Sequence, residues 1–416
     1  MKIRYKQIVI SSIGAILFSA CAGGQPSIPK VTVQEVDKYE KQYLQEYKKI
    51  KQNYKSNNIV KWLQASNKKE PCKMYVGTSP QNDRTKDSEY KIFWDGKCKN
   101  GYAYGLGREF ERGTLTNMEA LAIYSGKKEE PKYYIQKYNL NNILMEGDLN
   151  NGYSVKTFIK DEGLNFDIGY QYGFFGSKDL QPALIIYSSP FSDNLAFIKA
   201  YPNFYYQILD FTNNEFDTRK YEFAIFQNKK PNGFGFTSFK NGYINAGEIK
   251  NGTLVRKVQL PKSYFDKANT IFTEIKQAGQ KALEAQKQAW IVKKQYKQKI
   301  CKDNIKVDFI DNNEYKEICH EDKYFAKLKE KIDKKLAQIN IQKEKKRQQL
   351  QQQQLIQAEQ MKALAAQRQA QAAEAANNQA AWDSLNRSIQ NMNTNMNWQN
   401  TNFQLQQMNN YLRYGY

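Results

Sequence analysis

The chain has 416 residues, a formal net charge of +21 and a single histidine, His320. Metalloprotease motifs need two histidines on one helix face, and neither a phosphate-binding GxxxxGK[ST] loop nor a G-x-S-x-G nucleophile elbow occurs in the sequence. The sequence therefore gives no support for a catalytic site, a metal site or a cofactor. The charge favours association with anionic lipids or polymers.

The first 20 residues have the organisation of a signal peptide. A positively charged start precedes an apolar run over residues 8–18, and small residues follow before Cys21. The apolar run is shorter than the roughly 20 residues that a permanent bilayer-spanning helix needs. The segment over residues 17–21 resembles a lipobox, the processing motif of bacterial lipoproteins, although Phe18 departs from its usual aliphatic residue. An ordinary secretory signal, with Cys21 incidental, is the alternative.

If Cys21 carries lipid, residues 21–32 are its Gly/Pro/Ser-containing tether. Acyl chains anchor a protein by burying methylenes at about 0.8 kcal/mol each, so several chains on one cysteine give stable attachment. The resemblance to lipoproteins, with Ala22 after the cysteine, implies the outer membrane of a cell envelope.

The other four cysteines divide into two local pairs. Exported chains meet an oxidising compartment in which disulfides persist, and four cysteines allow three connectivities. We expect Cys72 to pair with Cys98 and Cys301 with Cys319, because each pair closes a short loop. A zinc site is the alternative, but neither pair has C-x-x-C spacing.

Residues 33–66 are predicted to contain an N-terminal helix. It ends either before Asn57 or near Ser66. One face carries an apolar and aromatic stripe at three- and four-residue steps, which predicts packing on the following domain or on a partner helix. The stripe consists of Val36, Tyr39, Tyr43, Tyr47, Ile50 and Tyr54.

Residues 70–262 are predicted to form antiparallel β-hairpins. Strand-like segments rich in Tyr, Phe, Ile and Val alternate with turn residues. The clearest segments are 132–138, 153–159, 182–189, 194–201, 204–211 and 220–226. Asn-Gly pairs, which favour type I′ hairpin turns, begin at Asn100, Asn151, Asn232, Asn241 and Asn251.

Part of this region resembles a MORN repeat, whose pattern is an aromatic residue followed by spaced glycines. The first copy is complete, with Trp94, Gly96, Gly101, Gly105 and Gly107. A second, split copy contains Gly233, Gly235, Gly242, Gly247 and Gly252. A weaker fragment covers 145–152, and the pattern fails between about 160 and 230. The resemblance implies stacked hairpins that act as a scaffold or binding surface, with lipid or protein partners.

Residues 263–375 are predicted to form a helical hairpin closed by the Cys301–Cys319 bridge. An apolar seam with alternating four- and three-residue steps predicts coiled-coil packing and allows self-association. The seam contains Ile271, Ile275, Ala278, Ala282, Ala285, Ala289, Val292 and Tyr296. The second helix continues it with Phe325, Leu328, Ile332, Leu336 and Ile339. Residues 376–416 form an Asn/Gln-rich tail with the composition of a disordered segment.

These features predict an α+β, lipid-anchored envelope protein that acts as a structural or interaction scaffold with other envelope proteins. Nucleic acid is a less favoured partner than envelope lipid or polymer, because the protein is expected to work outside the cytoplasm. The alternative function is binding of anionic envelope lipid or polymer through Lys327, Lys329, Lys331, Lys334 and Lys335. A third hypothesis, an envelope hydrolase, would rest on paired carboxylates among Asp161, Glu162, Asp167, Asp210, Glu215 and Asp217.

Overall fold

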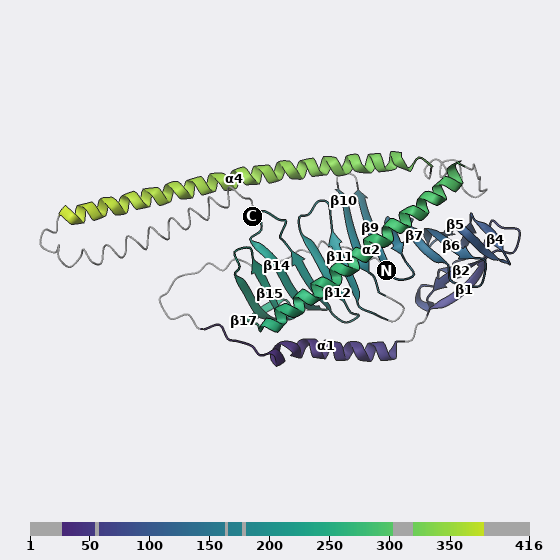
Figure 1. The fold of residues 1–416 in the computed structure, drawn as a ribbon, viewed down its shortest axis with the longest axis horizontal. Helices are drawn as coiled ribbons and strands as arrows, with labels where there is room; N and C mark the ends of the chain where they lie inside the picture. Colours follow the sequence, from purple (N-terminus) through teal and green to yellow (C-terminus); the bar gives the residue numbers. More distant parts are fainter. Residues whose placement is uncertain (1–26, 55–57, 163–164, 177–179, 303–318, 378–416) are drawn as a thin grey trace. The chain divides into compact units, whose positions relative to one another are not determined.

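The computed structural model describes residues 27–54, 58–162, 165–176, 180–302 and 319–377 (Figure 1). The predicted signal peptide, Cys21 and the tail beyond residue 377 lie outside these residues. The chain divides into two compact units between Lys334 and Lys335. The first unit contains one N-terminal helix, a large β-sheet and a long helix that packs on the sheet.

Helix α1 (Val33–Asn53) begins with a capping box. The Thr32 hydroxyl accepts a hydrogen bond from the Glu35 amide at 3.2 Å, and the Glu35 carboxylate accepts one from the Thr32 amide at 2.8 Å. The helix ends at Asn53, and strand β1 begins at Ile59. The end predicted near residue 66 is therefore wrong, whereas an end before Asn57 is confirmed.

The sheet is a meander in which nearly every strand pairs with its neighbours in sequence. From β5 to β17 each strand is antiparallel to the next. Strands β3 and β4 both pair with β5, β1 pairs with β2, and a parallel pairing of one residue from each strand, Lys73 and Tyr102, joins β2 to β5. The predicted antiparallel hairpin domain is confirmed.

The bounds of the elements follow the chain. The strands are β1 (Ile59–Gln64), β2 (Lys73–Thr78), β3 (Lys91–Trp94), β4 (Lys97–Lys99), β5 (Tyr102–Arg112), β6 (Asn117–Ser125), β7 (Lys132–Tyr138), β8 (Ile143–Asp148), β9 (Tyr153–Glu162), β10 (Asn165–Phe174), β11 (Ala183–Ser188), β12 (Leu195–Ala200), β13 (Tyr205–Asp210), β14 (Arg219–Gln227), β15 (Lys230–Phe239), β16 (Ile244–Lys250) and β17 (Thr253–Lys257). Short 3-10 helices are η1 (Pro80–Asn82), η2 (Arg84–Lys86) and η3 (Asn139–Asn141).

All six segments singled out as strands are strands, including those between 160 and 230. Two Asn-Gly pairs form turns with positive φ at both residues, as type I′ geometry requires; they begin at Asn100 and Asn251. At Asn151-Gly152 and Asn241-Gly242 only the glycine has a positive φ, of 78° and 87°. The turn predicted at Asn232 is wrong, because this residue lies inside β15. The β14–β15 turn instead uses Asn228 and Lys229, with φ of 51° and 64°.

Helix α2 (Lys262–Lys302) carries the predicted apolar seam. All of its eight seam residues are buried except the half-buried Ala285. The seam packs on strands β7 to β12, with Ile271 and Ile275 in one aromatic-rich core and Ala289, Val292 and Tyr296 in a second. Figure 1 shows this helix running across the sheet. The prediction of a coiled coil along this seam is therefore wrong, because the sheet is its partner.

Helix α4 (Glu321–Asn377) begins in the first unit and continues through the second. Among its described side chains none is buried, and Leu328, Ile332, Leu336 and Ile339 are half-buried. Within the second unit Ile341, Leu355, Ile356 and Met361 are more than half exposed. The Phe325 side chain lies outside the described residues.

Candidate functional site

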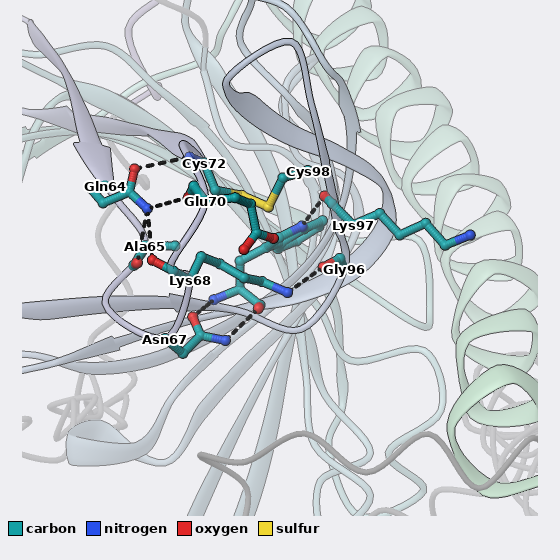
Figure 2. Close-up of a disulfide and its surroundings, with 10 residues drawn as sticks. Gln64, Ala65, Asn67, Lys68, Glu70, Cys72, Gly96, Lys97 and Cys98 are labelled. Atoms are coloured by element: carbon teal, nitrogen blue, oxygen red, sulfur yellow. Dashed lines mark hydrogen bonds between the residues drawn. A yellow bond between two sulfur atoms is a disulfide. The ribbon is translucent and has the colours of Figure 1, made fainter.

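The first MORN-like copy forms a hairpin that a disulfide joins to the residue before strand β2. Figure 2 shows Cys72, directly before β2, bridged to Cys98 in β4. The Cα atoms lie 5.4 Å apart, within the usual range for a disulfide. A Cys301–Cys319 bridge, with Cα atoms 5.7 Å apart, joins the end of α2 to the residues before α4. Both predicted pairings are present.

The indole of Trp94 fills the space that two glycines of the motif leave open. Trp94 is fully buried, and its Nε1 donates to the Lys97 carbonyl at 2.9 Å. A Cβ atom on Gly96 would lie 2.4 Å from the indole, and one on Gly107 would lie 2.7 Å from it. These distances exclude a side chain at either position without movement of the ring. The spacing of aromatic residue and glycines thus serves packing.

The β1–β2 loop is fixed onto this hairpin by polar side chains. Asn67 exchanges two hydrogen bonds with the Trp94 backbone, at 2.8 and 3.0 Å, and Lys68 donates to the Gly96 carbonyl at 2.8 Å (Figure 2). Gln64 donates to the Lys68 and Glu70 carbonyls. Side-chain hydrogen bonds therefore pair several backbone groups of the loop and of the hairpin beneath it.

The second copy has the same glycine spacing but different packing. Gly235 and Gly247 face each other across strands β15 and β16. A Cβ on Gly247 would lie 2.2 Å from the Leu254 side chain, so a leucine occupies this space instead of an indole. Gly233 lies next to Tyr39 of α1, and its φ of 123° favours glycine. The two copies are alike in sequence spacing and distinct in their contacts.

A buried acidic cluster lies on the inner face of strand β5, and the sequence analysis missed it. Glu109 and Glu111 are 1% and 0% exposed. Arg84 binds both oxygens of Glu111, one of them at 2.5 Å from Nη2. The hydroxyls of Tyr124 and Tyr133 donate to Glu109 at 2.5 and 3.2 Å. A signal was present, since alternation along Arg108-Glu-Phe-Glu-Arg112 places both acids on one face.

Burial gives the Glu109 carboxyl group an unusual proton affinity. Loss of solvent and the neighbouring Glu111 raise the pKa of Glu109 well above its ordinary value. Glu111 lies against the Arg84 guanidinium, which compensates its charge. The cluster can hold a proton near neutral pH, but both carboxyl groups are closed off from solvent. Its geometry is that of a packed interior.

Helix α2 is attached to the hairpin by another buried acid, Asp95. The Tyr296 hydroxyl donates to Asp95, which also accepts a hydrogen bond from the Arg108 amide at 2.5 Å. Lys299 donates to the Leu106 carbonyl at 2.8 Å. Burial raises the pKa of Asp95 above its ordinary value. The contacts tie the disulfide-linked hairpin and α2 into one body.

The carboxylates considered for a hydrolase have other partners or lie apart. Asp161 forms an ion pair with Lys331 at 2.5 Å, and Asp217 forms one with Arg219 at 2.6 Å. Asp210 accepts from the Thr212 amide at 2.9 Å in a turn. Asp167 is exposed, and the side chain of Glu162 lies outside the described residues. No group of three or more His, Cys, Asp or Glu side chains suited to a metal occurs in the described residues.

The five candidate lysines of α4 differ in their surroundings. Lys327 and Lys329 are exposed, whereas Lys331 pairs with Asp161. Lys334 pairs with Glu330 at 2.6 Å within the helix, and Lys335 is half-buried. Four of these five lysines are therefore exposed, and two of the four, Lys331 and Lys334, are in ion pairs.

Comparison with known proteins leaves the chain without an assigned family. None of the helices described by the structure combines the length and apolarity needed to cross a bilayer. No protein-family model matches the sequence, and no curated protein matches it.

Proposed function

We propose that this protein is an exported, lipid-anchored structural or interaction scaffold of the cell envelope. The observation that carries the proposal is the division of its five cysteines. Cys21 follows a signal-like segment, and the four others form two disulfides within the folded part. An odd count with one cysteine at a lipobox-like position fits export followed by lipidation.

The scaffold role is supported by the way the β domain is built. The MORN-like positions are occupied by packing contacts, Trp94 is buried, and the acidic residues of β5 are closed off from solvent. A long meander offers extended surface and edges to partners, as repeated hairpin architectures do. The protein would therefore act through its surface, without chemistry of its own.

Intact mass spectrometry of the protein released from membranes of its own cells tests this proposal. We expect a mass that begins at Cys21 and includes acyl chains, with four thiols that react with an alkylating agent only after reduction. The same protein with Cys21→Ser is the control, and it should appear in the soluble fraction. A chain that keeps Met1, or four thiols that react without reduction, would remove the basis of the proposal.

A second candidate function is binding of anionic envelope lipid or polymer through α4. It is favoured by the exposure of Lys327 and Lys329. Exposed cations are screened by salt, with a Debye length of about 8 Å at physiological ionic strength. Retention of the Cys21→Ser chain on an anionic polymer, lost at high salt, would distinguish this function from a purely structural one.

A further inference from the structure

Strand β17 is the last strand of the meander, and the first described residues of the chain pair with Gln259, just after this strand ends. The strand pairs with β16 on one side. All five of its residues are exposed, with Leu254 at 41% and Val255 at 52%. An exposed edge with aliphatic side chains is unusual, because such edges invite association.

The N-terminal segment of the described chain lies next to this strand. Val31 donates to the Gln259 carbonyl at 3.1 Å, and the Gln259 amide donates to the Pro29 carbonyl at 2.8 Å. Lys30 and Gln259 form a parallel bridge. Since the pairing is parallel, the chain before Lys30 runs back toward Lys257 and Arg256. The described part of the chain, which starts at Ser27, thus begins beside β17.

Basic and aliphatic residues gather around this point. Ile28 is 53% exposed, and Lys30 is also exposed. Arg256 forms ion pairs with Glu248 at 2.7 Å and with Glu35 at 3.7 Å. We call the set the anchor edge; it contains Ile28, Lys30, Leu254, Val255, Arg256 and Lys257. Its combination of three aliphatic side chains and three cations is the kind that partitions into a bilayer interface.

The short tether limits which surface can reach a membrane. Five residues, 22–26, separate Cys21 from Ser27, the first described residue. The six steps from one Cα atom to the next span at most about 20 Å when the chain is fully extended. By comparison, the 41 residues of α2 extend over about 60 Å. A lipid on Cys21 therefore holds the surroundings of Ser27 close to the bilayer while other parts of the body can lie far from it.

We propose that the anchor edge is a membrane-contact surface that binds the anionic headgroups of the bilayer to which Cys21 is attached. This inference rests on the proposed lipid anchor and adds an orientation to it. Lys30 and Lys257 contact headgroup phosphates beside the ion-paired Arg256, and Ile28 and Val255 enter the interface. Each cation near an anionic surface adds to the attraction, and the gain is lost in uncharged lipid.

A lipid surface suits this edge better than a second β-strand does. Charged side chains on an edge strand oppose strand addition, and so do bulges that twist the edge. The β17 edge has Arg256 and Lys257, and its register with β16 shifts between Glu248 and Ile249. Pairing between two copies would also bring identical cations together. Pairing of β17 with the same strand of a second copy is therefore the alternative that the experiment must distinguish from membrane contact.

The test places an environment-sensitive fluorophore on the lipidated full-length protein in vesicles. The introduced cysteine in Val255→Cys is the labelling site, because Cys21 is acylated and the other four cysteines are in disulfides. Leu115→Cys is the matched control, since Leu115 is 74% exposed in the β5–β6 turn. Eleven strand spacings of about 4.8 Å separate β6 from β17 along the sheet. Figure 1 shows the two at opposite ends of it.

Nitroxide-labelled headgroups in phosphatidylglycerol vesicles then serve as the quencher. We expect quenching at position 255 to exceed that at 115 by at least threefold, and to fall by half or more in phosphatidylcholine vesicles. Adding Lys30→Gln should produce a similar fall. Equal quenching at both positions, or equal quenching in both lipids, would overturn the inference.

Two further outcomes identify the source of a failure. Mass spectrometry of the reconstituted protein establishes acylation first, so a chain without acyl groups contradicts the proposed function itself. An acylated chain that stays on the vesicles with position 255 unquenched contradicts only the membrane contact. Label–label contact at position 255 that persists in detergent would show pairing between copies, and would also overturn the inference.

Discussion

Single residues of the hairpin around Trp94 show why a glycine pattern can predict packing. The motif positions were visible in the sequence, and the structure brings Gly96 and Gly107 against the same indole. Gly101 takes a positive φ of 79° in a turn, so it has a different role. The spacing alone could not distinguish these roles, because it gives the positions of the glycines in the sequence and not the residues that they contact in the fold.

Gly107→Ala tests the contact with the indole. A Cβ at this position would lie 2.7 Å from the Trp94 ring and 2.8 Å from Asp95 Oδ1. Such overpacking costs about 1–3 kcal/mol, so we expect a lower urea midpoint. Gly169→Ala is the control, because nothing lies within 4 Å of its added Cβ, and its effect should stay within about 0.5 kcal/mol. Equal losses in both variants would contradict the packing role.

At the scale of elements, sequence periodicity located the buried face of α2 but not its partner. An apolar row at four- and three-residue steps lies on one side of a helix whatever it packs against. Small residues at Ala278, Ala282 and Ala289 suit close approach to a second helix, and they suit close approach to a sheet equally well. The strands could be predicted because each pairs with a strand that is close to it in sequence, and turn residues mark where one strand ends and the next begins.

Ala282→Leu distinguishes the two partners of the seam. Ala282 is fully buried where α2 packs on the sheet, so the larger side chain should cost about 1–3 kcal/mol through overpacking. Leucine in a coiled-coil seam would instead add burial. Gln288→Leu, at an exposed position of the same helix, is the control and should leave the urea midpoint nearly unchanged. A midpoint raised by Ala282→Leu would restore the coiled-coil interpretation.

At the scale of the whole molecule, the features that could be predicted are those that depend on residues close together in sequence. Hairpin order follows from local pairing, and the disulfides follow from short spacing. The joint between β2 and β5 and the docking of α1 on the sheet depend on residues far apart in sequence. The Tyr39–Glu248 hydrogen bond, for example, spans 209 positions. No periodicity within one segment carries information about such a contact.

The acidic cluster of β5 has a consequence for the stability of the whole protein. Burial raises the pKa of Glu109 above its unfolded value of about 4.3. The folded state then holds more protons than the unfolded state between these two values. The stability that Glu109 contributes is therefore present below about pH 4 and is lost as pH rises through its folded pKa.

Glu109→Gln removes this titration and keeps an oxygen that can accept from Tyr124 and Tyr133. We expect urea unfolding at pH 5, 7 and 9 to show that the free energy of unfolding of the variant increases relative to that of the wild type as pH rises. The increase should be at least about 1.4 kcal/mol, the value of one pKa unit. Glu89→Gln, at an exposed position before β3, should show no such trend. A difference between variant and wild type that stays flat across this range would mean that Glu109 is ionised in the folded protein, with Arg84 compensating both acids of the cluster.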